Sequence, residues 1–314
     1  MKAGAAQDHA TLTESRLPLP LYRRGKVREV YEVDPEQLLI VASDRVSAFD
    51  VVLREPVPRK GEVLTQISAF WFERLAGIFP SHYLTARTSE ILERVPQLRG
   101  REEQIAGRAM LVRRAEPAPF ECVVRGYLSG SAWAEYRETG TLAGEVMAPG
   151  LVESARLDPP LFSPATKAEA GHDVNVPFGA MAGALGVELA LRLRDASFAL
   201  YQAGREHAAG RGIIIADTKF EFGTDPNGTL RLIDELLTPD SSRFWPAERY
   251  APGGTQPSFD KQPLRDYLAS LKVSGGWNGE TPPPPLPDDI VEATSVRYLE
   301  AYRLLTGRRL ERDL

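Results

Sequence analysis

The sequence predicts an α+β protein whose sheets are mainly antiparallel. Two runs rich in strand-forming residues, Val27–Val33 and Leu38–Ala42, flank the turn-forming segment Asp34–Gln37, a pattern typical of a β-hairpin. Apolar residues recur at three- and four-residue steps across Val63–Ile78, as expected of an amphipathic helix. Hairpins interspersed with helices do not form a regular βαβ series, so the pattern favours α+β over α/β.

Later elements are predicted in the same way. A short helix is expected at Ser129–Arg137, with serines at its start and Gly140 at its end. A longer helical region spans about Phe178–Ala209, and a buried strand runs from Ile213 to Phe222. This strand leads into a turn at Asp225–Gly228.

Prolines and changes of composition divide the chain into four parts. The stiff connector Glu116–Pro119, with two prolines, marks the main boundary. We expect a loose N-terminal arm, a β-rich domain, a central α+β domain and a C-terminal extension with helices, at residues 1–20, 21–116, 117–245 and 246–314. The extension contains the four-proline spacer Pro282–Pro285 and a final helix that begins at Asp288 or Asp289.

Composition places the chain among ordinary globular proteins. Its 314 residues suffice for two domains, and its formal net charge of -5 argues against a general nucleic-acid binder. Cys122 is the single cysteine, so no internal disulfide forms, as is usual in a reducing cytoplasm. The segment Met1–Ala10 has no apolar signal core, and no apolar run reaches membrane-spanning length. We expect a cytoplasmic protein without nucleic-acid or membrane partners.

Several common catalytic and nucleotide-binding motifs are absent from the sequence. It contains no Gly-x-Gly-x-x-Gly, no Gly-x-x-x-x-Gly-Lys-Ser/Thr, no His-Glu-x-x-His and no Gly-x-Ser-x-Gly. Its four histidines show no metal-ligand spacing. A bound nucleotide would therefore need a different cradle.

The most informative segment is the strand that precedes the turn at Asp225–Gly228. Side chains alternate along a strand, so Asp217, Lys219 and Glu221 share one face, and the other face is aromatic. A hairpin brings Asp234 back beside this strand. A two-residue loop puts Asp234 on the face of Glu221, whereas a three-residue loop puts it on the opposite face.

Two carboxylates and a lysine on one face suit Mg²⁺ and nucleotide phosphates. Magnesium binds a few carboxylate oxygens together with phosphate and water oxygens, and a lysine neutralises charge on a transferred phosphoryl group. A solvated strand face with an exposed ion pair explains the same residues equally well.

Four further polar segments each have a functional and a plain structural interpretation. The basic stretch Tyr22–Tyr31 suits phosphates, although a charged edge strand is the commoner explanation. The loop Ala42–Asp50 follows a strand directly, as binding loops and plain turns both do. Arg125–Ser131 suits an anion at a helix start or simple N-capping. Pro239–Arg243 offers another arginine or a turn.

A fifth polar cluster, Lys167–Asp173, precedes the long helical region. Its charged groups suit an amino-acid ligand, and a surface loop is an equal alternative.

Taken in order, these segments resemble the SAICAR synthetase (phosphoribosylaminoimidazole-succinocarboxamide synthase) family. The matching stretches are Gly25–Arg28, Ser43–Asp50, Arg125–Ser131, Lys167–Asp173, Asp217–Gly223 and Asp234–Arg243. Ser258–Gln262 and the region after it resemble the longer form of the family.

The resemblance implies an ATP-dependent ligase of de novo purine biosynthesis. Such an enzyme joins L-aspartate to carboxyaminoimidazole ribonucleotide through an acyl phosphate and releases SAICAR, ADP and phosphate. The implied fold has antiparallel sheets and helices akin to ATP-grasp enzymes and kinase nucleotide-binding lobes. The implied cofactors are ATP and Mg²⁺, the partners are the small-molecule substrates, and the oligomeric state stays open. The β-rich domain would bind nucleotide, and the central domain would carry the substrate and Mg-ATP sites.

The resemblance also assigns roles to residues at matching positions. The ATP contacts would be Lys26, Arg28, Arg113, Ala115, Glu116, Lys219, Glu221 and Asp234. Of these, Glu221 and Asp234 would hold Mg²⁺. The substrate contacts would be Ser43, Asp44, Arg125, Ser129, Ser131, Lys167, Glu169, His172, Asp173, Lys219 and Arg243. Lys219, Asp217 and Lys26 would be catalytic.

Two other functions use the same residues. A phosphotransferase would use the Mg-ATP hairpin on a hydroxyl acceptor and would not depend on aspartate. A non-catalytic nucleotide-binding or scaffold protein would keep the fold, but it would not need the complete set of Lys26, Lys219, Glu221 and Asp234.

Overall fold

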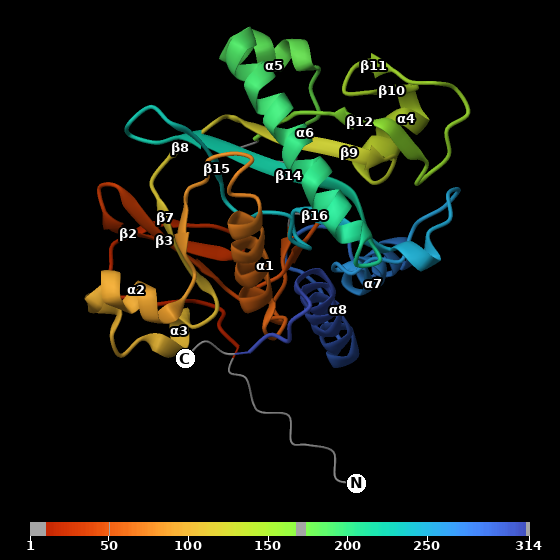
Figure 1. The fold of residues 1–314 in the computed structure, drawn as a ribbon. Helices are drawn as coiled ribbons and strands as arrows, with labels where there is room; N and C mark the ends of the chain where they lie inside the picture. Colours follow the sequence, from red (N-terminus) through yellow and green to blue (C-terminus); the bar gives the residue numbers. More distant parts are fainter. Residues whose placement is uncertain (1–10, 50, 168–173, 312–314) are drawn as a thin grey trace.

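The structure is a computed structural model that describes residues 11–49, 51–167 and 174–311. Two antiparallel sheets lie side by side, with helices packed on their faces (Figure 1). The predicted α+β class is confirmed. Within the described residues, no helix is both long and apolar enough to cross a membrane.

The first sheet contains the predicted N-terminal hairpin. Its strand order is β1-β2-β3-β7-β6, with β1 at Leu21–Arg24, β2 at Arg28–Asp34, β3 at Gln37–Ala42, β6 at Tyr83–Thr85 and β7 at Ala109–Arg113. The hairpin β2–β3 pairs Val30 with Ile40 and Tyr31 with Leu39. Alternation then sends Tyr31 and Leu39 into a small core beneath this sheet, while Val30 and Ile40 face the main core.

The second sheet is built around the long strand β14, Ile213–Thr224. Its neighbours are β8 (Glu116–Pro117), β9 (Phe120–Tyr127), β15 (Leu230–Ile233) and β16 (Ser242–Pro246), and β9 also pairs β12 (Arg156–Phe162) and β13 (Ala165–Thr166). Two small hairpins complete the strands, β4–β5 (Ser47–Ala48, Val51–Val52) and β10–β11 (Thr141–Leu142, Glu145–Val146). The chain passes from the first sheet to the second at residues 114–115, between β7 and β8.

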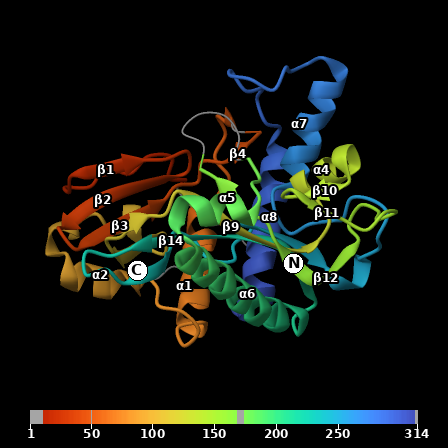
Figure 2. The same cartoon turned by 90° about the horizontal axis from the view of Figure 1, so that it is seen from above.

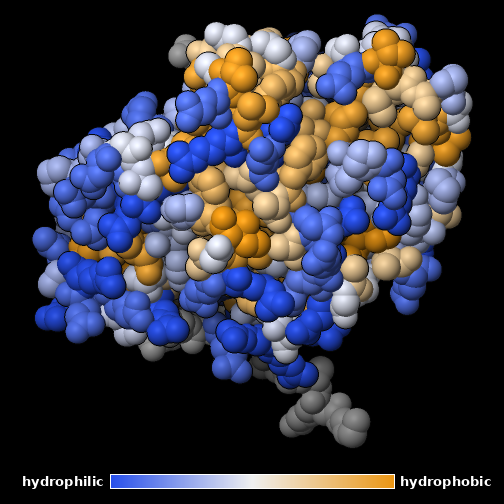
Figure 3. Space-filling view, turned by 45° about the horizontal axis from the view of Figure 1, so that its top comes forward, coloured by the Kyte–Doolittle hydropathy of each residue, from blue (hydrophilic) through white to orange (hydrophobic). Residues whose placement is uncertain are grey.

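Helices cover both sheets. α1 (Lys60–Arg74) packs against β3 and β7, and α6 (Val187–Ala209) crosses β9 and β14 (Figures 1 and 2). The others are α2 (Thr88–Arg94), α3 (Glu102–Ile105), α4 (Ser131–Thr139), α5 (Phe178–Leu185), α7 (Gln262–Ser274) and α8 (Asp288–Thr306), with short 3₁₀ turns at Pro96–Leu98 and Ala247–Arg249. Figure 3 shows apolar surface in the upper middle of one face, the region of α5 and α6.

Three helix predictions need correction. α1 ends at Arg74, short of Ile78, because Gly77 falls where the pattern continues and glycine disfavours helix. The expected single region 178–209 is two helices, since Gly186 has φ +85° and ψ 146° between them. α4 is preceded by Gly130 without a side-chain cap, so the expected serine capping is wrong, although Gly140 ends the helix as predicted.

Residues 11–20 were expected to form a loose arm, and they are instead packed on the first sheet. Leu12, Leu17 and Leu19 contact the small core beneath that sheet. The backbone N–H of Leu12 donates to Asp44, and the hydroxyl of Ser15 bonds Tyr31 at 2.9 Å. The Leu-Pro repeat lacks helical or strand periodicity, so its packing was not visible in the sequence.

Candidate functional site

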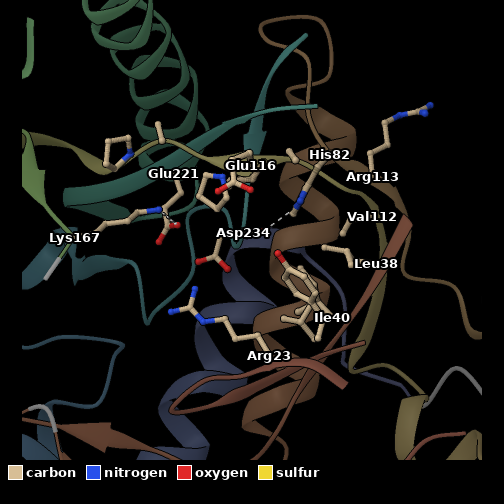
Figure 4. A pocket seen from close by; sticks show the side chains of 17 residues that line it. Arg23, Leu38, Ile40, His82, Val112, Arg113, Glu116, Lys167, Glu221 and Asp234 are labelled. Carbon is tan, nitrogen blue, oxygen red and sulfur yellow. Dashed lines mark hydrogen bonds and ion pairs between the residues drawn. The ribbon is translucent and has the colours of Figure 1, made fainter. Parts of the chain in front are cut away.

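A cavity of about 640 Å³ lies between the two sheets (Figure 4). One wall is apolar and comes from both sheets: Val30, Leu38, Ile40, Val112 and Ile233. Glu221 on β14 and Asp234 just after β15 form an acidic end. We call this space the first cavity. A planar apolar group fits against its wall while charged groups reach the carboxylates.

The connector between the sheets forms the edge of the first cavity. Arg113, Ala115 and Glu116 all line it, as do residues 117–119. Pro117 pairs with Gly223 of β14, where a side chain would lie 2.7 Å from the carbonyl oxygen of Glu116. Gly223 therefore permits the close approach that fixes the connector. The guanidinium of Arg113 points away from the carboxylates (Figure 4), so at this residue the backbone faces the site.

The β14–β15 hairpin has the register of a three-residue loop. Glu221 pairs with Ile233, and the N–H of Asp225 donates to the carbonyl of Thr229. A regular continuation of β15 would carry Asp234 to the face opposite Glu221. Asp234 instead has φ +68°, leaves the strand and lines the same cavity as Glu221. This backbone turn brings the two carboxylates into the same cavity. Of the two predicted loop lengths, the hairpin has the three-residue loop.

Glu221 and Asp234, the two carboxylates at the acidic end of the first cavity, each have a cationic partner. Lys167 Nζ lies 2.6 Å from Glu221 Oε2, and Arg28 makes a two-point ion pair with Asp234, with Nη2 3.0 Å from Oδ2. Burial alone would raise the pKa of Asp234, but the charges of Arg28 and Lys219 outweigh it and lower that pKa. Asp234 is therefore ionised.

His82 also lines the first cavity, and no sequence pattern indicated it. Its ring Nε2 lies 3.2 Å from the backbone oxygen of Asp234. Burial lowers the pKa of His82 to about 4, against weaker opposing effects of Asp234. The imidazole is therefore neutral near pH 7 and adds no charge beside the carboxylate.

A second cavity, of about 210 Å³, opens on the same face of β14. Its polar lining comes from β9, β14, β16 and neighbouring loops: Glu121, Arg125, Ser131, Asn175, Asp217, Thr218, Lys219, Ser241 and Arg243. The strand register explains why these side chains lie together, because Asp217 pairs with Arg125 on one side and with Arg243 on the other. Arg125 Nη1 lies 3.4 Å from Asp217 Oδ2, and Arg243 forms an ion pair with the same carboxylate.

Two arginines share the single carboxylate of Asp217, so the second cavity has cationic capacity for an anion. Gly130 lets Arg243 lie close: a Cβ there would overlap the guanidinium, and Gly130 has φ +57°. The glycine of the predicted anion loop is thus required sterically.

Lys219 stands between the two cavities. It lines the second cavity, whereas Glu221, two residues further on the same face, lines the first. Its Nζ lies 2.6 Å from Glu121 Oε1. Burial would lower the pKa of Lys219, but Glu121, Glu221 and Asp234 raise it overall, so the amine is charged.

Several predicted residues line neither cavity. Ser43 and Asp44 are buried: Ser43 donates to the carbonyl of Val27, and Asp44 pairs with Arg108 at 3.0 Å. Lys26 lies in the exposed turn before β2, and Ser129 is buried beside α4. Arg28 reaches the first cavity only through Asp234. Glu169, His172 and Asp173 lie outside the described residues.

Sequence reasoning missed Glu121, Asn175 and Ser241 in the second cavity. Glu121 had a usable signal, because alternation along β9 places it on the face of Arg125. Asn175 had none, since it lies in a loop whose path depends on the bond that its Oδ1 accepts from Arg125 at 3.2 Å.

The first cavity suits a magnesium ion that arrives with a nucleotide. Within the described residues, no group of three or more His, Cys, Asp or Glu side chains is arranged to hold a metal alone. Magnesium typically takes one or two carboxylates and completes its shell with phosphate and water oxygens. Glu221 and Asp234 supply that number of carboxylates in one cavity.

Comparison with known proteins gives a consistent result. The model of the family described as SAICAR synthetase matches residues 21–283. A phosphoribosylaminoimidazole-succinocarboxamide synthase from Methylibium petroleiphilum is 52% identical over 299 residues, covering 94% of this chain and 98% of the relative. One from Geobacter metallireducens is 51% identical over 291 residues, covering 92% and 95%.

Solved structures agree with the sequence relatives. The SAICAR-synthase from Saccharomyces cerevisiae, complexed with SAICAR, superimposes with a TM-score of 0.86 at 41% identity, covering 95% of this chain and 99% of that one. A type-2 SAICAR synthetase in complex with ADP gives a TM-score of 0.64 at 23% identity, covering 91% and 98%, and supports the fold alone.

Proposed function

The chain belongs to the SAICAR synthetase family of ligases in purine biosynthesis, and from this premise we propose that it couples ATP hydrolysis to the ligation of L-aspartate to carboxyaminoimidazole ribonucleotide. The products would be SAICAR, ADP and phosphate. The observation that carries the proposal is the pair of adjoining cavities on one face of β14, with Lys219 between them. A cytoplasmic location and exclusively small-molecule partners belong to the same proposal.

ATP is assigned to the first cavity. The apolar wall suits the adenine ring, and the connector at Arg113–Glu116 offers backbone groups at its edge. The phosphates would extend toward Glu221 and Asp234, where Arg28 and Lys219 supply positive charge. Lys26, in the turn before β2, would reach the phosphates from the open side.

Glu221 and Asp234 would hold the magnesium ion. When bound, Mg²⁺ neutralises phosphate charge during phosphoryl transfer. In the structure Lys167 and Arg28 hold these two carboxylates in ion pairs at the cavity. On binding, Arg28 would turn from Asp234 to the phosphate oxygens.

Carboxyaminoimidazole ribonucleotide is assigned to the second cavity. Arg125 and Arg243 suit its phosphate because guanidinium groups bind phosphate through paired hydrogen bonds, and Ser131 adds a hydroxyl. The carboxylate of the imidazole ring would then face Lys219 and the first cavity. Asp217 positions both arginines through its ion pairs with them.

The reaction proceeds in two displacements. A carboxylate oxygen of the imidazole nucleotide attacks the γ-phosphorus, a new O–P bond forms, and the bond to the ADP oxygen breaks. The neutral aspartate amine then attacks the acyl carbon: a C–N bond forms, the C–O bond to the phosphoryl group breaks, inorganic phosphate leaves, and the nitrogen gives up a proton to water. Lys219 neutralises negative charge on the transferred group, and positioning supplies most of the rate because three anionic reactants must meet.

Aspartate is assigned to the segment Lys167–Asp173. Lys167, the one described member of this set, lies at the mouth of the first cavity close to Glu221. Its ammonium group suits a carboxylate of the amino acid once Glu221 turns to the metal. Ser43, Asp44 and Ser129 stay predicted substrate contacts by family resemblance alone.

Omission assays test the proposed function. ADP release is measured with Mg-ATP, carboxyaminoimidazole ribonucleotide and aspartate, leaving out each in turn. The ligase requires all three and forms the succinocarboxamide product. ADP release that ignores aspartate would instead identify a phosphotransferase, and no release would identify a nucleotide-binding protein.

A further inference from the structure

A helix beyond the family match contacts the loop that carries Ser241 and Arg243 of the second cavity. The match ends at residue 283, and α8 begins at Asp288. Tyr298 on α8 is fully buried, and its hydroxyl donates to Asp240 Oδ1 at 2.5 Å. The C-terminal extension therefore contacts the loop that enters β16.

Asp240 has two further buried partners. Lys60, the first residue of α1, donates to Oδ2 at 2.7 Å, and Lys261, just before α7, lies 3.5 Å from Oδ1. Burial alone would raise the pKa of Asp240, but Lys261, Lys60 and the Tyr298 hydroxyl lower it far below its ordinary value. Asp240 is thus an anchored carboxylate on which three elements converge.

Other charged groups also act on this carboxylate. Glu235 interacts with Asp240 electrostatically, and Asp260 and Arg265 act on Lys261 and Tyr298. They leave the Asp240 carboxylate ionised near neutral pH.

The loop that carries Asp240 presents two groups to the second cavity. Ser241 and Arg243 line that cavity, and the carbonyl of Ser241 accepts a bond from the N–H of Lys219 at 2.9 Å. Thr238 closes the loop, since Ser242 N–H donates to its carbonyl at 2.9 Å. A shift of Asp240 would therefore move both cavity-lining residues.

α8 is itself held by two contacts just before Tyr298. Ser295 Oγ donates to the carbonyl of Pro58 at 2.8 Å, next to the start of α1. Arg297 donates to the carbonyl of Ser258, whose hydroxyl donates to the carbonyl of Phe244 on β16. Figure 1 shows α8 beside α1. These contacts hold α8 in place and so fix the position of the Tyr298 hydroxyl that bonds Asp240.

We propose that Tyr298 and Lys261 are positioning residues of the second cavity: through Asp240, the C-terminal extension sets the place of Ser241 and Arg243 and so the affinity for the imidazole nucleotide. The inference rests on the proposed function for the identity of that nucleotide. The first cavity is separate from this chain of contacts, since none of these residues lines it. The expected signature is a selective change in affinity for one substrate.

Tyr298→Phe is the direct test, because it keeps the buried ring and removes the hydroxyl. We expect the KM for carboxyaminoimidazole ribonucleotide to rise about tenfold, the effect of losing one hydrogen bond to a charged group. The KM values for ATP and aspartate should stay within about twofold. Tyr302→Phe on the same helix is the matched control, since Tyr302 faces a different small cavity, and its kinetics should equal wild type.

A second variant and a binding measurement keep the test decisive. Lys261→Met should raise the same KM, and calorimetric titration with SAICAR should show weaker binding in both variants. An equal change in all three KM values, or a lowered melting temperature with unchanged KM and SAICAR affinity, would overturn the positioning role. Absence of aspartate-dependent turnover in the wild-type protein would instead refute the proposed function, so the two failures are distinguishable.

Discussion

Arg28 and Asp234 lie 206 residues apart in the sequence and form a two-point ion pair beside the first cavity. Arg28 opens strand β2 of the first sheet, and Asp234 follows β15 of the second. The pair therefore connects the two sheets at the place where a nucleotide and its metal are proposed to bind. Both side chains are about a quarter exposed, so water weakens the attraction without abolishing it.

Removing the cation of this pair should destabilise the fold in a pH-dependent way. In Arg28→Met, Asp234 stays largely buried without its partner, and we expect the free energy of unfolding at pH 7 to fall by about 1–2 kcal/mol after allowance for solvent exposure. Asp234 has a lowered pKa in the folded protein, so the contribution of the pair is present above the ordinary value of 3.8 and is lost as pH falls through the folded value.

Urea unfolding at pH 7 and at low pH measures this effect. The difference between wild type and Arg28→Met should shrink as Asp234 becomes protonated. Arg87→Met is the matched control, because Arg87 pairs with Glu90 at an exposed site and its loss should cost less than about 0.5 kcal/mol. Equal losses of unfolding free energy in the two variants would show that the Arg28–Asp234 pair contributes no more to stability than an exposed surface pair.

His82 should make stability rise with pH in the weakly acidic range. Its pKa is about 4 in the folded protein and 6.5 as the ordinary value, so the unfolded chain binds more protons between these limits. The free energy of unfolding should then fall by roughly 3 kcal/mol as pH drops from 7 to 4, on the basis of 1.36 kcal/mol for each pKa unit.

His82→Gln removes this titration and should flatten the pH dependence of unfolding between pH 4 and 7. His207→Gln is the control: burial lowers the pKa of His207 too, but that histidine is much less enclosed. An unchanged slope in His82→Gln would show that folding does not lower the pKa of the His82 imidazole.

The hairpin β2–β3 and the charged face of β14 were predictable because both depend on local alternation. Asp217, Lys219 and Glu221 share a face in any regular strand, whatever packs around it. The same reasoning placed Arg125 near an anion site, and the register of β9 with β14 completes that site. The local sequence pattern therefore identified some of the residues that line each cavity, but not the complete lining.

Other parts of the site depend on contacts that no local pattern encodes. Asp234 reaches the first cavity through a positive φ that follows an irregular turn. Asp44 is withdrawn from the surface by Arg108, which lies 64 residues further along the chain. The role of Asp240 depends on Lys60 and Tyr298, from opposite ends of the sequence. Such partners become visible only when the chain is folded.

Gly130→Ala should impair the second cavity and leave the first intact. A methyl group at this position would overlap the guanidinium of Arg243, and φ +57° is unfavourable for alanine. Arg243 would be displaced from Asp217, and we expect the KM for the imidazole nucleotide to rise by about tenfold or more. The KM for ATP should change little.

Gly179→Ala is the matched control for this steric argument. Gly179 lies in α5 with nothing within 4 Å of an added Cβ, so alanine should fold normally and keep wild-type kinetics. Steady-state assays with each substrate varied in turn separate the two variants. If Gly130→Ala behaved like Gly179→Ala, Arg243 would not be held in the place that the structure gives it.

Glu221→Ala should abolish turnover while the fold is kept. The side chain is partly exposed at the cavity and its backbone pairing with Ile233 is unaffected, so stability should change by less than about 1 kcal/mol. Loss of a metal-holding carboxylate should lower kcat by roughly a hundredfold or more, as for removal of other groups that stabilise transferring charge. It should also weaken the dependence of ATP affinity on magnesium.

Calorimetric titration of the protein with ATP, with and without Mg²⁺, measures metal-dependent nucleotide binding separately from turnover. Wild-type protein should bind Mg-ATP more tightly than free ATP, and Glu221→Ala should bind both with similar affinity. Glu138→Gln, at an exposed position of α4, should keep the wild-type difference. Normal turnover in Glu221→Ala would show that Glu221 does not hold the magnesium ion. The proposal that Glu221 and Asp234 together form one metal site would then be wrong.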